Sequence, residues 1–390
     1  MKLKHYHLFL FATLCFALVF IGINNKYDRF YRIPGINNEN RILIENYMSE
    51  ADQNYMIENN INVNHFIRFI RCGGFHIQNY EYYEAVEKSN FFASSQEIVT
   101  HTNTIVESLE KNASWSVSGR LNQLLDSKLL LDYENNENFN FDHLSVYKEL
   151  KSYYDNSNYI ETIDQYIEDL QSIGYKSVEE CSEVLSDLYS YYSLNQIDRL
   201  IELSKEKKQT VFLRNPDDLL VVLSGEYTID SYVPKNLVLL DDVPRYRYFS
   251  YLRQDAYQDL VELCQAYEQS EDYEAYFVYS AYQSYETIQE EDALQAGYKE
   301  EQLGLSVTFR VPNKKLEEFD QTSFYKWLNE HGYEYGYVLR YPSDKQDVTN
   351  QEGRNYLYRY VGKEAAKAMH DQNITTIEEY KQVLLEHKLG

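Results

Sequence analysis

The chain has 390 residues, of which 44% are hydrophobic and 15% aromatic, including 40 tyrosines. This composition excludes disorder throughout, and the scarcity of glycine (14) and proline (6) disfavours an all-β protein with many tight turns. The 37 basic and 62 acidic residues give a net charge of −25, which repels nucleic acid, so no nucleic-acid partner is expected. The four cysteines are scattered, and they predict neither a zinc knuckle nor a disulfide framework.

An almost unbroken apolar run over residues 8–23 follows basic residues. Such a run is typical of a signal sequence or a short membrane anchor, although its sixteen residues are few for a full span of about 20. No small-residue cleavage site follows the run, which favours an uncleaved anchor over residues 1–24. We therefore expect the protein at the cell membrane, with a polar stalk over residues 25–42 and its ectodomain outside the cytoplasm.

Residues 43–213 show helical periodicity and are expected to form a helical domain. Apolar residues from Ile160 to Leu170 recur at helical spacing, and Ser177 with Glu180 predicts a capping box that opens the next helix. The histidines of this half lack metal-ligand spacing. This half therefore shows no catalytic constellation.

The pattern changes after about Arg214, where prolines and extended segments begin. Residues 305–311 alternate between apolar and polar side chains, which predicts a strand with an apolar face and a polar face. Further strands are expected within residues 274–280, 335–341 and 356–361, with helices between them. The expected fold class is therefore α+β, with a helical N-terminal region followed by a small antiparallel-sheet domain over residues 214–390.

Five segments of this second region form an ordered series of motifs. They are Tyr232-Val-Pro-Lys-Asn-Leu-Val238, Leu252-Arg253 with Ala256, Ser280-Ala-Tyr-Gln-Ser-Tyr-Glu-Thr287, Tyr335-Gly-Tyr-Val-Leu-Arg-Tyr-Pro342 and Tyr358-Arg-Tyr-Val-Gly362. In this order the series resembles the VanY-like D-alanyl-D-alanine carboxypeptidases, bacterial zinc enzymes that trim peptidoglycan stem peptides. The resemblance covers about 140 residues and implies a D-Ala-D-Ala peptidase-like fold for residues 214–390.

The resemblance also implies a catalytic zinc with three protein ligands and an open position for water. The family's ligands come from the motifs S-x-H-x-x-G-x-A-x-D and E-P-W-H, which align on Lys299–Thr308 and Arg354–Leu357. At the three ligand positions this chain has Glu301, Thr308 and Leu357. A threonine hydroxyl is a poor zinc donor and leucine is none, so neither zinc nor another cofactor is expected.

Two further positions of the family's site also differ. The catalytic glutamate is replaced by Arg354, which cannot act as a general base because an arginine does not give up its proton in proteins. The family's substrate- and oxyanion-binding arginine is replaced by Gln283, which offers no charge-assisted hydrogen bond. The opposite charges gained at Glu301 and Arg354 predict that these two side chains face each other, unless both point to solvent.

The leading hypothesis is an inactive, membrane-anchored, carboxypeptidase-like protein that binds peptidoglycan stem peptides or a cell-wall protein. A possible peptide groove is formed by Tyr282, Ser284, Tyr285, Gln302, Tyr356 and Tyr358. The tyrosines among them suit a hydrophobic core equally well. Two alternatives stay open: an active peptidoglycan carboxypeptidase with a non-standard metal site, and a scaffold that binds partners through the helical half.

Overall fold

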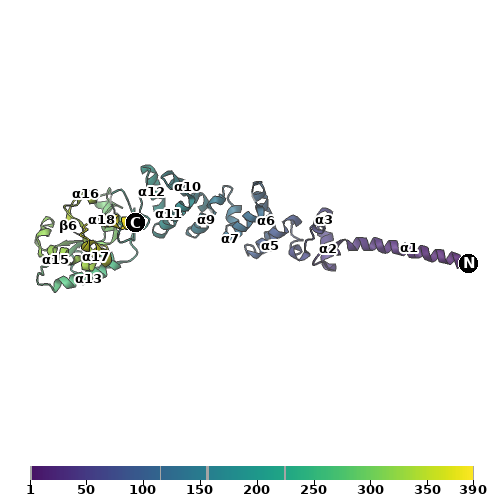
Figure 1. The fold of residues 1–390 in the computed structure, drawn as a ribbon, viewed down its shortest axis with the longest axis horizontal. Helices are drawn as coiled ribbons and strands as arrows, with labels where there is room; N and C mark the ends of the chain where they lie inside the picture. Colours follow the sequence, from purple (N-terminus) through teal and green to yellow (C-terminus); the bar gives the residue numbers. More distant parts are fainter. Residues whose placement is uncertain (1, 115, 155–157, 224, 390) are drawn as a thin grey trace. The chain divides into compact units, whose positions relative to one another are not determined.

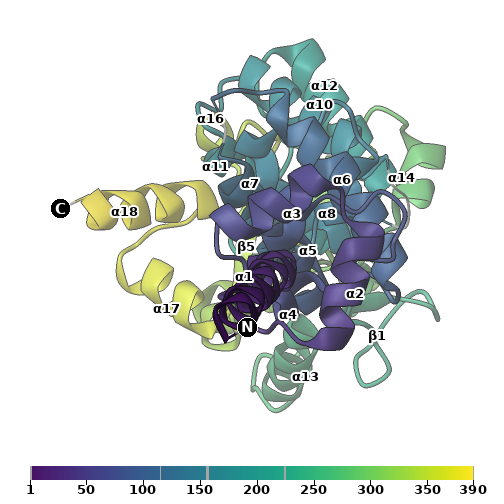
Figure 2. The ribbon, with the colours of Figure 1, turned by 90° about the vertical axis from the view of Figure 1, so that its right-hand side faces the viewer.

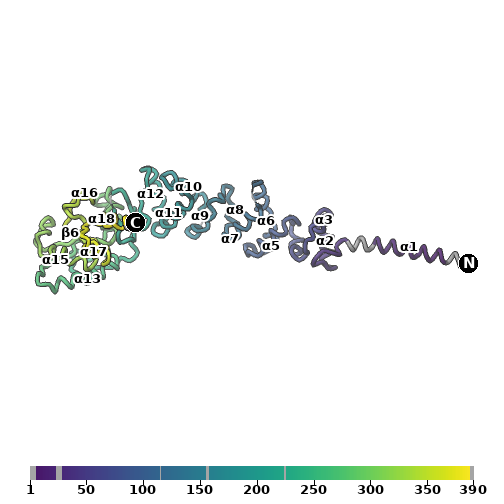
Figure 3. The backbone as a smooth tube through the Cα atoms, in the orientation of Figure 1, coloured from purple at the N-terminus to yellow at the C-terminus, as the bar shows by residue number. Residues whose placement is uncertain are grey.

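The computed structural model describes residues 2–114, 116–154, 158–223 and 225–389. The backbone packs into two compact units, Met1–Glu161 and Thr162–Gly390. Figures 1 and 3 follow the chain from the helices of the first unit to the sheet of the second.

The first unit is helical, and no strand occurs among its described residues. Its elements are α1 (Lys2–Tyr27), η1 (Asp28–Phe30), α2 (Asn38–Tyr47), α3 (Glu50–Glu58), α4 (Val63–Phe66), η2 (Ile77–Asn79), α5 (Tyr80–Lys88), α6 (Ser95–Glu110), α7 (Val117–Ser127), α8 (Leu130–Glu134), η3 (Phe141–His143), α9 (Leu144–Leu150) and η4 (Lys151–Tyr153). Phe30 and Ile33, in the segment predicted as a polar stalk, are buried in one core cluster with Ile44.

Helix α1 contains the apolar run of residues 8–23. Along the part of the chain that the structure describes, no helix combines the length and the apolarity that crossing a membrane requires.

Helices precede the strands of the second unit, and the first of them, α10, begins in the last residues of the first unit. The helical elements are α10 (Tyr159–Ser172), α11 (Val178–Tyr191), α12 (Leu194–Lys207), α13 (Gln254–Glu268), α14 (Tyr285–Glu291), η5 (Glu300–Leu303), η6 (Leu316–Gln321), α15 (Ser323–His331), η7 (Gly332–Tyr335), α16 (Gln346–Thr349), α17 (Lys363–Asp371) and α18 (Ile377–Leu389). Half of the capping box predicted for α11 is observed, since the Glu180 backbone N–H donates to the Ser177 hydroxyl. The Glu180 carboxylate accepts instead from the Lys176 backbone N–H. Figure 2 shows α17 and α18 joined by an extended loop.

A four-stranded antiparallel sheet in the order β3-β4-β6-β5 forms the centre of the second unit. Its strands are β3 (Phe277–Ser280), β4 (Ser306–Arg310), β5 (Tyr337–Tyr341) and β6 (Arg354–Tyr360), and a separate pair is β1 (Leu237–Leu239) and β2 (Tyr251–Arg253). The predicted α+β class and its small antiparallel sheet are thereby confirmed. One side of the sheet is closed by packed aromatic rings, among them Phe309, Phe324 and Tyr358.

Candidate functional site

The candidate site lies where η5, β4 and β6 meet. Thr308 of β4 pairs in register with Leu357 of β6, three residues beyond the start of that strand at Arg354. Glu301 belongs to η5, the short turn before β4, and its carbonyl accepts a hydrogen bond from the Gln283 backbone N–H at 3.2 Å. The fold therefore gathers all five aligned positions from segments that are far apart in the sequence.

Glu301 and Arg354 face each other, as their opposite charges predicted. Arg354 Nη1 lies 3.4 Å from Glu301 Oε1, and the two side chains are 28% and 12% exposed. The Arg354 guanidinium also lies over the ring of Tyr341, 4.5 Å from its centroid. The second carboxylate oxygen of Glu301, Oε2, is buried and has no hydrogen-bond partner among the described residues.

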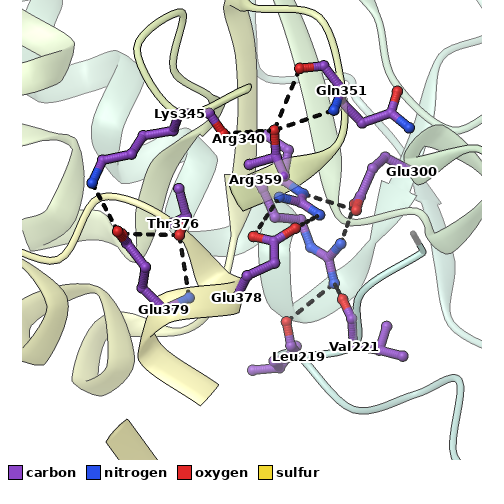
Figure 4. A network of polar contacts seen from close by, with 11 residues as sticks. Leu219, Val221, Glu300, Arg340, Lys345, Gln351, Arg359, Thr376, Glu378 and Glu379 are labelled. Carbon is purple, nitrogen blue, oxygen red and sulfur yellow. Dashed lines mark hydrogen bonds and ion pairs between the residues drawn. The ribbon is translucent and has the colours of Figure 1, made fainter. Parts of the chain in front are cut away.

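A buried ionic network anchors the turn that carries Glu301 (Figure 4). The neighbouring Glu300 is 1% exposed and accepts hydrogen bonds from Arg340 Nε, at 2.8 Å, and from Arg359 Nη1. Arg340 donates in addition to both oxygens of Glu378, at 2.9 and 3.1 Å, and thereby ties α18 to β5. Burial raises the pKa of Glu300, but the two guanidinium groups outweigh that effect and hold the pKa below its ordinary value.

The network was not predicted from the sequence. Glu300, Arg340 and Arg359 all lie inside the family-like motifs, but an arginine in a strand motif gives no sign of being buried. Arg359 Nη2 also donates to the carbonyls of Leu219 and Val221, at 3.1 and 3.3 Å, and so holds the segment before the sheet (Figure 4). Fixing η5 to β5 and β6 determines where Glu301 can point.

The residues present do not fit the zinc ion that the resemblance implies. Of the three ligand positions only Glu301 carries a group that suits zinc, because Thr308 offers only a hydroxyl and Leu357 is aliphatic and 0% exposed. Within the described ranges, no three His, Cys, Asp or Glu side chains come together in a way that could hold a metal ion.

The six residues of the predicted peptide groove fall into two groups. Gln302 is buried, and its amide donates to the carbonyls of Asp230 and Tyr232, so it holds the chain together rather than facing a ligand. Tyr358 is 1% exposed and donates to Asn329 of α15, which places it in the core. The remaining four are partly exposed: Tyr282, Ser284, Tyr285 and Tyr356. Ser284 also caps α14 by accepting from the Thr287 backbone N–H.

Comparison with known proteins gives the class of the second unit. The family model "VanY: D-alanyl-D-alanine carboxypeptidase" matches residues 249–363. YodJ of Bacillus subtilis (strain 168), assigned as a carboxypeptidase, is 30% identical over 191 residues, which are 44% of this chain and 70% of YodJ. A D-alanyl-D-alanine carboxypeptidase of Enterococcus faecium is 37% identical over 98 residues, 25% of this chain and 31% of that protein. The chain therefore belongs to the VanY-like D-alanyl-D-alanine carboxypeptidase family, and it is a carboxypeptidase-like, peptidoglycan-related protein.

Two solved structures are similar to parts of the chain. The LdcB LD-carboxypeptidase is 30% identical, with a TM-score of 0.40 over 44% of this chain and 89% of LdcB. VanYB, solved in complex with D-alanine-D-alanine, is 24% identical, with a TM-score of 0.33 over 42% of this chain and 97% of VanYB.

Proposed function

We propose that this protein is a catalytically inactive family member that binds peptidoglycan stem peptides. The observation that carries the proposal is the ion pair between Glu301 and Arg354, at positions that align with a zinc ligand and the catalytic glutamate of the family. Metal-assisted peptide hydrolysis requires a dication that lowers the pKa of a bound water and polarises the scissile carbonyl. A guanidinium beside a carboxylate supplies neither effect.

The groups that would assist the metal are also missing. Arg354 carries a guanidinium, which has only N–H donors and no acceptor for a proton from water. Gln283 offers a neutral amide where a charged donor would stabilise a developing oxyanion. The metal ligands, the family's base and its charged oxyanion donor are therefore all replaced in this site.

Retention of peptide binding is supported by the family and by the surface around Gln283. The curated enterococcal relatives are named as D-alanyl-D-alanine carboxypeptidases, whose substrates are peptides ending in D-alanine. Tyr282, Tyr285 and Tyr356 are partly exposed beside the altered positions, and tyrosine gives large contact area with a polar hydroxyl.

The location of the protein is a further part of the proposal. Residues 8–23 attach the chain to the cell membrane, so that the peptidase-like unit meets peptidoglycan outside the cytoplasm. Support comes from the exposed apolar side chains along α1, which include those of Phe9, Phe16 and Phe20. The full chain is expected to sediment with membranes, and its recovery as a soluble protein with residues 8–23 intact would contradict attachment.

A release assay tests inactivity. Purified full-length chain, incubated with a stem pentapeptide and added zinc, is expected to liberate no free D-alanine, while the E. faecium relative serves as the active control. Equilibrium dialysis against the same labelled pentapeptide tests binding. Turnover would refute inactivity, and the absence of any peptide binding would refute the binding role.

A further inference from the structure

The ion pair between Glu301 and Arg354 is incompletely formed. A closed arginine–carboxylate pair makes two parallel hydrogen bonds of about 2.7–2.9 Å. Here a single contact of 3.4 Å joins the side chains, close to the outer limit of a hydrogen bond. Oε2 of Glu301 is buried without a donor in the described parts of the chain. A buried, unpartnered carboxylate oxygen is destabilising unless another molecule donates to it.

Arg354 differs from the arginines that hold this unit together. Arg340 uses Nε, Nη1 and Nη2 in hydrogen bonds to Glu300 and Glu378. Arg359 likewise donates from all three nitrogens. Among the described residues, the Arg354 guanidinium has one hydrogen-bond acceptor, the Glu301 carboxylate, although the arginine side chain is only 28% exposed. Its remaining donors are therefore available to a ligand.

The surroundings of Arg354 hold the guanidinium in a fixed orientation. The Arg354 guanidinium lies over the ring of Tyr341, a residue that is 2% exposed and whose ring also lies under the guanidinium of Arg340. Stacking on an immobile ring orients the N–H edge of the guanidinium and reduces the entropy lost when a carboxylate binds. An oriented guanidinium with unused donors is suited to bidentate recognition of a carboxylate.

Resting on the proposed function, we propose that Arg354 and Glu301 together bind the C-terminal residue of a stem peptide. The Arg354 guanidinium donates to the terminal α-carboxylate, and the Glu301 carboxylate accepts from the amide N–H of the same residue. An ammonium group is a poorer ligand because Arg354 repels it, and Gln283 lacks the charge to hold the carboxylate instead. The former base position has thereby become the anchor for the peptide terminus.

The test compares two forms of one pentapeptide, one with a free C-terminal carboxylate and one with a C-terminal amide. Each form is titrated into the full chain by calorimetry, which measures its Kd. The amide is expected to bind at least about tenfold more weakly, because a charge-assisted bidentate contact is lost. In R354Q the acid and the amide are expected to bind equally. R247Q, which removes an exposed arginine of the same unit, is expected to retain the preference for the acid.

Two outcomes separate this inference from the proposed function. Equal binding of acid and amide by the unaltered chain would overturn the role of Arg354 while leaving a peptide-binding protein. Binding of neither peptide would overturn the proposed function itself. Because the acid-to-amide ratio is measured within one variant, a general loss of stability in R354Q does not imitate the expected result. Retention of the full preference in folded R354Q would also overturn the inference.

Discussion

The buried carboxylate of Glu300 gives the sharpest stability prediction. The substitution E300Q keeps the side-chain shape but removes the negative charge shared by Arg340 and Arg359, both 0% exposed at their side chains. Removing one partner of a buried ion pair typically costs about 3–5 kcal/mol, because the opposite charge is left uncompensated. For a unit of this size, each 1 kcal/mol lowers Tm by roughly 2–4 °C, so a decrease of roughly 6–20 °C is expected.

Differential scanning calorimetry of the full chain measures this decrease in the transition of the second unit. The matched control is E262Q, which removes a carboxylate from the exposed pair with Lys363 and is expected to cost at most about 1 kcal/mol. A decrease in Tm in E300Q no larger than that in E262Q would refute the reasoning. It would mean that Glu300 does not hold the two guanidinium groups in the folded state.

The same carboxylate predicts how stability depends on pH. Because the folded-state pKa of Glu300 is lowered, its stabilising contribution is fully present above the ordinary value of 4.5 and is lost as the pH falls through the folded-state pKa. The chain is therefore expected to lose stability in acid more steeply than E300Q does. Parallel pH profiles of the free energy of unfolding for the two proteins check this difference, and coincident slopes would contradict it.

Four further variants test the site and its support. R354L is expected to lower the free energy of unfolding by about 1–3 kcal/mol in urea denaturation, since it leaves the Glu301 carboxylate unpaired. The double variant E301L/R354L is expected to lower the free energy of unfolding by less, because it leaves no unpaired charge. Restoring the family's residues with E301H, T308D, L357H and R354E is expected to raise bound zinc toward one ion per chain, measured by mass spectrometry of the metal. G336A is expected to lower Tm, because Gly336 has φ +80° and an added Cβ would lie 3.0 Å from the Gly362 backbone.

Much of the second unit could be predicted from the sequence because its signals are local. The alternation in residues 305–311 predicted the strand that is observed as β4, Ser306–Arg310. The motif order placed the site positions on the correct elements, and simple charge complementarity predicted that Glu301 and Arg354 meet. Each of these predictions depends on neighbouring residues or on one pair of charges.

The buried network and the true environment of two groove residues could not be predicted in this way. Glu300 contacts residues that are 40 and 59 positions away in the sequence, and no sequence periodicity predicts contacts over such separations. Tyr358 and Gln302 carry polar groups that suit a ligand as well as a buried partner, so sequence reasoning could not assign them to the core. Only the packing of α15 and of the segment near Asp230 determines their partners.

The zinc content of the purified full-length chain tests the central claim most directly. After mild chelation and re-addition of one equivalent of zinc, followed by gel filtration, we expect far less than one ion per chain, since Glu301 is paired with Arg354 and Leu357 offers no donor. One tightly retained zinc ion per chain, lost on substitution of Glu301, would contradict the account.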